Sequence, residues 1–149
     1  MYTAQQVANY VIDYGLHNNI PVSNLKLQKL LYFIWIDYYK ENERKLFADK
    51  FCAWKFGPVI PKVYYEYCAF GGFPIFAQSY PSNDIAQRDR TIINETIEKY
   101  KNASVGYLVE LTHDPGKPWD KTYLGGIGEH DVIPFEDIIE LECKVNAES

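Results

Sequence analysis

The residues best suited to chemistry in this chain lie together in LTHDPGKPWD, which spans residues 111–120. Its histidine could act as a general base, and a hydrolase would then need a nucleophile and an orienting acid beside it. Cys52 and Cys68 could supply a thiol, but no motif links either of them to His113, and no GxSxG sequence occurs. We therefore expect no catalytic site and no enzyme, with a small hydrolase that uses His113 as the alternative.

The histidines and cysteines are too scattered to predict a metal site. Neither CxxC nor HExxH occurs, and such spacings are what bring several ligands to one ion. The sequence GGIG, residues 125–128, is a weak echo of a phosphate loop, because the Lys-Ser or Lys-Thr of a P-loop is missing and Glu129 and Asp131 would repel phosphate. We expect no metal and no cofactor, and reduced thiols. The scattered residues are His17, His113, His130, Cys52, Cys68 and Cys143.

The charge of the chain narrows the class of partner. The net charge is −5, which argues against direct nucleic-acid binding, because that function needs basic residues to neutralise phosphates. An acidic protein suits a basic protein partner instead. The longest apolar run, Leu30 to Ile36, is far shorter than the roughly 20 residues that a membrane span needs. We expect a soluble, cytoplasmic protein with no membrane partner.

The apolar spacing predicts an α+β fold over residues 1–149: a mostly helical single domain of about five to six helices with a very small β-sheet or hairpin. Thr3 with Gln6 forms a capping box for a helix over Ala4–Tyr14, which Gly15 would end. The next helix, capped by Ser23 or Asn24, is apolar nearly all round and is therefore predicted to be central.

Lys26 and Lys29 on the second helix are interpreted as a solvated or snorkelling edge.

The remaining elements are less regular in pattern. The other expected elements, in order, are a strand within residues 51–56 preceded by a possible turn at 48–50, a helix from Pro61, a loop at 73–84 with Asp84 as a cap, a helix over Ile85–Lys101, a short helix after Ser104, a short strand at 131–133 and a helix after Pro134.

Two prolines make residues 111–120 a fixed corner. Pro115 and Pro118 restrict the backbone on both sides of Gly116, which suits a turn between two helical segments. Trp119 is predicted to be a buried plug whose indole N–H reaches a carbonyl, and His113 to form a hydrogen bond within the corner. We interpret the corner as structural rather than catalytic.

Three segments together resemble a known family. They are SNLKLQKLLYFIWIDYY, FCAWKFGPVIPKVYYEY and LTHDPGKPW, and they occur in the order that marks Panacea-domain, or SocA-like, antitoxins. The family patterns fall on Leu25 to Tyr32, Ala53 to Tyr64 and Leu111 to Trp119. The resemblance covers nearly the whole chain, and three ordered segments make it far more specific than one short motif.

The resemblance implies a non-enzymatic, often phage-associated antitoxin of a toxin–antitoxin system, which binds and neutralises a protein toxin encoded beside it. The alternative within the family is an adaptor that delivers a toxin to an ATP-dependent protease. The charge of −5 suits a basic toxin. The residues on or beside the family patterns that are expected to take part in partner binding are Lys29, Tyr32, Trp54, Lys55, Tyr64, His113 and Trp119.

Overall fold

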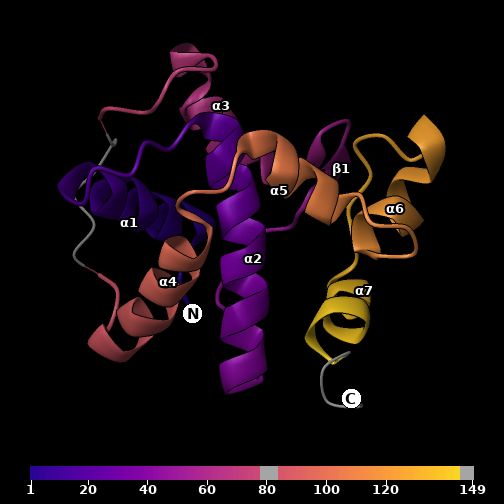
Figure 1. Ribbon diagram of the computed structural model, residues 1–149. Coiled ribbons are helices and arrows are strands. Elements are labelled where there is room, and N and C mark those ends of the chain that lie inside the picture. The colour runs from indigo at the N-terminus through magenta and orange to yellow at the C-terminus, as the bar shows by residue number, and fades with distance from the viewer. Residues whose placement is uncertain (78–83, 145–149) are drawn as a thin grey trace.

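Helix α2, Asn24–Asn42, runs through the centre of the computed structural model, which describes residues 1–77 and 84–144 (Figure 1). Every residue from Lys26 to Ile36 is buried, so the helix is covered on all sides. Ser23 caps it by accepting a hydrogen bond from the Lys26 N–H. The predicted central helix is confirmed, and the other elements are arranged around it.

Helices α1, Ala4–His17, and α4, Gln87–Tyr100, pack together against one flank of α2 (Figure 1). The capping box at Thr3 is confirmed. The predicted stop at Gly15 is wrong, because the helix continues to His17. A Cβ atom on Gly15 would lie 2.7 Å from the Ile20 carbonyl oxygen, so this glycine permits a close approach of the chain instead.

The small sheet lies on the other flank of α2 (Figure 1). Strand β1, Cys52–Trp54, pairs antiparallel with β2, Gly57–Val59, through a turn at Lys55 and Phe56. The strand predicted within residues 51–56 is confirmed, although it is only three residues long, and the turn predicted at residues 48–50 is wrong. Gly57, directly after the observed turn, has a φ of +110°, a conformation that favours glycine.

Short helices complete the fold, which is a mostly helical α+β structure as predicted. The described residues contain seven α-helices. Helix α6 begins at Pro118, within the stretch that the sequence indicated as a turn. Asp84 does not cap α4, since Ala86 holds the N-cap position without a side-chain bond. The expected strand at 131–133 is a single bridge between Val132 and Cys52. The remaining elements are α3 (Pro61–Glu66), η1 (Cys68–Phe70), α5 (Val105–Thr112), α6 (Pro118–Tyr123), η2 (Leu124–Gly126), α7 (Phe135–Ile138) and the π-helix η3 (Ile139–Cys143).

Within residues 1–77 and 84–144, no helix combines the length and the apolar character that crossing a membrane would require. The expected loop at 73–84 falls in part on residues 78–83, which lie outside the described residues.

Candidate functional site

Lys29 lies fully buried beneath the β-hairpin. Its Nζ donates a hydrogen bond to the Pro58 carbonyl oxygen over 2.8 Å, and loss of water around it lowers its pKa to about 7. The interpretation of Lys26 and Lys29 as a solvated edge is wrong, because the Lys26 ammonium is also mostly buried and bonds to the carbonyls of Lys101 and Ala103. Both side chains fasten α2 to neighbouring segments.

Gly57 rests directly on Lys29. A Cβ atom at this position would lie 2.6 Å from the Lys29 Cε and 2.6 Å from the Thr112 Oγ1, and the positive φ adds strain for any other residue. The hairpin can therefore approach α2 and the end of α5 this closely only with glycine at position 57.

Trp119 joins the corner at residues 111–120 to the same hairpin. Its indole N–H donates to the Trp54 carbonyl oxygen over 2.7 Å, and only 7% of the residue is exposed. The ring stacks on His113, with centroids 3.7 Å apart, and on Tyr123, with centroids 4.4 Å apart. The predicted buried plug with a carbonyl partner is confirmed.

His113 contributes its flat ring to this stack. Its Nε2 is buried, and no hydrogen-bond partner for that atom exists among residues 1–77 and 84–144, so the bond expected within the corner is not made by Nε2. Burial, with the nearby Lys29 charge as the second cause, lowers the pKa of His113. We call the six residues of this buried region the signature joint: Lys29, Gly57, Pro58, Thr112, His113 and Trp119.

Tyr32, near the middle of α2, makes a different contact. Its hydroxyl donates to the Glu142 Oε2 over 3.1 Å, and the Lys117 ammonium lies 3.6 Å from the other oxygen of that carboxylate. Burial raises the pKa of both Tyr32 and Glu142. The side chain of Tyr32 thus binds η3 to the core and is only 1% exposed.

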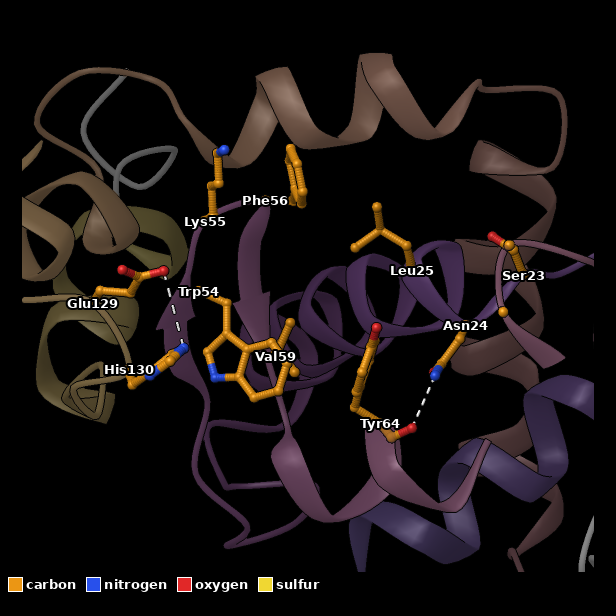
Figure 2. Close-up of a pocket in the computed structure, with 12 residues that line it drawn as sticks. Ser23, Asn24, Leu25, Trp54, Lys55, Phe56, Val59, Tyr64, Glu129 and His130 are labelled. Carbon is orange, nitrogen blue, oxygen red and sulfur yellow. Dashed lines mark hydrogen bonds and ion pairs between the residues drawn. The ribbon is translucent and has the colours of Figure 1, made fainter. Parts of the chain in front are cut away.

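A pocket of about 470 Å³ opens on the outer side of the hairpin (Figure 2). Trp54 lies at its centre, with the Tyr64 ring 5.1 Å and the His130 ring 5.3 Å from it, both edge to face. The Asn24 side chain donates to the Tyr64 carbonyl and fixes the start of α2 against α3. We call this the hairpin pocket; it is lined by Ser23, Asn24, Leu25, Trp54, Lys55, Phe56, Val59, Tyr64, Gly71, Gly72, Glu129 and His130.

The residues predicted for partner binding are divided among the signature joint, the contact of Tyr32 and the hairpin pocket. Lys29 and Trp119 are buried in the signature joint with His113, and Tyr32 is buried separately. The other three, Trp54, Lys55 and Tyr64, line the hairpin pocket together. Their side chains are exposed or half-buried, so the pocket is where predicted residues meet the surface.

The sequence analysis missed part of the pocket wall. Glu129 and His130 directly follow GGIG, which was considered only as a weak echo of a phosphate loop. Phe56 and the neighbouring Tyr65 are 53% and 62% exposed. A large aromatic residue followed by Gly-Pro could have indicated an exposed hairpin turn. Glu129 and His130 gave no such signal, because they reach Trp54 only through long-range pairing.

The geometry gives little support to thiol chemistry. Burial raises the pKa of Cys52, and it raises that of Cys143 to about 12, so neither thiol is readily ionised. Among the described residues no thiol forms a hydrogen bond with His113, and no three His, Cys, Asp or Glu residues gather as metal ligands.

Comparison with known proteins agrees with the pattern of the three segments. A family model described as Antitoxin SocA-like, Panacea domain, matches residues 27–120. The chain is also 36% identical to Antitoxin SocA of Caulobacter vibrioides (strain NA1000 / CB15N), over 78% of this chain and 68% of that protein. This chain belongs to the SocA-like, Panacea-domain antitoxin family. The comparison with solved structures found no match.

The Panacea-domain match covers the signature joint in full, from Lys29 to Trp119. Glu129, His130 and the residues before Leu27 lie outside the matched segment, although they line the hairpin pocket. In this antitoxin-family chain, the matched segment therefore supplies the scaffold of the hairpin, and flanking segments complete the pocket beside it.

Proposed function

We propose that this protein is the antitoxin of a toxin–antitoxin pair and that it neutralises a cognate protein toxin by direct binding. The family supports an antitoxin role, and the observation that carries the proposed mode of binding is the hairpin pocket. An open pocket with aromatic walls resembles the anchor sites that dominate protein interfaces. The described residues offer no comparable set of catalytic groups.

The proposed toxin-binding surface is the hairpin pocket with the exposed aromatic rings beside it. Trp54 and Tyr64 form its wall, and Phe56 and Tyr65 extend it outward. Beneath this surface the hairpin is held by bonds to the carbonyls of Trp54 and Pro58, so a partner meets a pre-formed site. Such a site loses little conformational freedom when it binds.

The charge supports a basic toxin. The chain carries −5 overall, and opposite fields speed the encounter of two proteins. We therefore propose that the toxin has a positively charged face, and that it is encoded in a gene beside that of this protein.

The test is co-expression of this protein with the products of the neighbouring genes, followed by growth assays and co-purification. The proposal is supported if a neighbouring product stops cell growth when expressed alone, if cells grow when this protein is expressed with it, and if the two proteins co-purify. Trp54→Ala should lose protection, whereas Phe76→Ala, an equally aromatic change at a 75% exposed position outside the pocket, should keep it. Thermal melts show whether each variant is folded. If no neighbouring product is toxic or bound, the proposal fails.

A further inference from the structure

The carboxylate of Glu129 lies at the mouth of the hairpin pocket. The single ion pair of Glu129 is with His130 at 4.0 Å, which carries charge only when the imidazole is protonated. Within residues 1–77 and 84–144, no lysine or arginine pairs with Glu129. The mouth of the pocket thus offers a carboxylate for a further ion pair.

The wall behind this carboxylate is aromatic. The Trp54 ring packs edge to face with Tyr64 and lies 6.0 Å from Tyr65, and Leu25 and Val59 add apolar surface deeper in (Figure 2). Aromatic faces attract cations through the negative charge above the ring, and Trp does so best. A cation with an apolar stem would therefore find favourable contacts along the whole pocket.

The one lysine of the pocket does not fill this place. Figure 2 shows the Lys55 side chain pointing away from the Trp54 ring, and its ammonium lies 5.6 Å from the centre of the Phe56 ring. The wall of Trp54 and Tyr64 stays open to an incoming group.

We propose that the hairpin pocket accepts an arginine side chain of the cognate toxin, an inference that rests on the proposed function. The arginine stem packs on Leu25 and Val59, the flat guanidinium stacks on the Trp54 and Tyr64 wall, and its N–H groups donate to Glu129. Arginine fits better than lysine because a planar fork can stack and bind a carboxylate through two hydrogen bonds at once.

The first experiment needs no toxin. N-acetyl-arginine methylamide is titrated into the full chain while the Trp54 indole N–H signal is followed by NMR, with Trp54→Phe used to assign that signal. The citrulline analogue has the same shape without charge, and the lysine analogue has charge without the planar fork. Glu129→Gln removes the carboxylate charge, and Glu95→Gln, an exposed position on α4, is the matched control.

The arginine probe should shift the Trp54 signal to saturation, with weaker binding by the lysine analogue and none by citrulline. Glu129→Gln should weaken arginine binding about fivefold, as expected for one exposed ion pair, and Glu95→Gln should leave it unchanged. Equal binding of arginine and citrulline, no effect of Glu129→Gln, or no shift of the Trp54 signal would each overturn the arginine assignment.

The second experiment separates this inference from the proposed function. Where a neighbouring toxin co-purifies with the wild-type chain, Glu129→Arg should release it, and replacing one arginine of the toxin by alanine should do the same. Toxin binding that survives Glu129→Arg would overturn the arginine contact and leave the antitoxin assignment in place. If the arginine probe binds but no toxin is found, the pocket is specific for arginine, and the proposal that a toxin supplies this arginine is rejected.

Discussion

Replacement of Lys29 by methionine should change how stability depends on pH. Methionine has nearly the same length as lysine without a charge, so Lys29→Met keeps most of the packing under the hairpin. In the wild-type protein the burial of Lys29 lowers its pKa from 10.5 to about 7. Between these two values the unfolded chain holds a proton that the folded protein has released.

The sign of the effect follows from this difference in bound protons. The free energy of unfolding rises with pH wherever the unfolded state binds more protons. The destabilising effect of the buried charge on the wild-type protein is therefore complete below pH 7 and is relieved as the pH rises toward 10.5. The relief is about 1.4 kcal/mol for each pH unit in this window. Lys29→Met lacks this dependence.

Urea unfolding of both proteins at several pH values gives the measurement. Between about pH 7.5 and 9.5 the stability of the wild-type protein should rise by about 2–3 kcal/mol relative to Lys29→Met. The comparison cancels other groups that titrate in this range, because both chains share them. A difference that stays constant with pH would refute the argument that the Lys29 ammonium is desolvated.

Four further predictions follow from the packing and charge. Trp119→Ala should lower the free energy of unfolding by about 3–5 kcal/mol in urea titrations, since two stacked contacts and one hydrogen bond are lost, and toxin neutralisation should fail with the fold. Leu31→Ala should cost about 2–5 kcal/mol, and an unchanged urea midpoint would show that this position is not core. His113→Phe should lose less stability than the wild-type protein as the pH falls below 6.5. The pKa of His113 is lowered in the folded protein, so the unfolded chain takes up the proton first and the wild-type protein is destabilised. Melts at successive pH values measure this difference. The association rate with a cognate toxin should fall as salt rises, and a rate that is flat with salt would reject charge steering.

The sequence could predict the elements that depend on local pattern. The capping box at Thr3 and the central α2 are confirmed, because hydrophobic spacing and caps act within a few residues of each other. The burial of Trp119 could be predicted as well, since two prolines shortly before it restrict the backbone and a large ring gains free energy by leaving water. The three segments with family patterns were enough to indicate the antitoxin family.

Features that depend on distant partners could not be predicted in this way. The acceptor for the Lys29 ammonium is the Pro58 carbonyl, which only the folded hairpin brings into reach, so a lysine on a helix was misjudged as solvated. Gly15 has the residue type of a helix stop, but its role is set by the returning Ile20 carbonyl. The Glu129 side of the hairpin pocket likewise depends on pairing across the fold.

The hairpin pocket also has an order of assembly during synthesis of the chain. The residues of its hairpin have all been synthesised by Val59. The hydrogen bond to the Trp54 carbonyl, however, needs the indole of Trp119. The outer edge of β1 needs Asp131, whose carbonyl accepts from the Ala53 N–H. A ribosome must therefore translate most of the message before the pocket exists. A chain that is cut short before Trp119 would lack these contacts, so the pocket is a property of finished molecules rather than of translation begun.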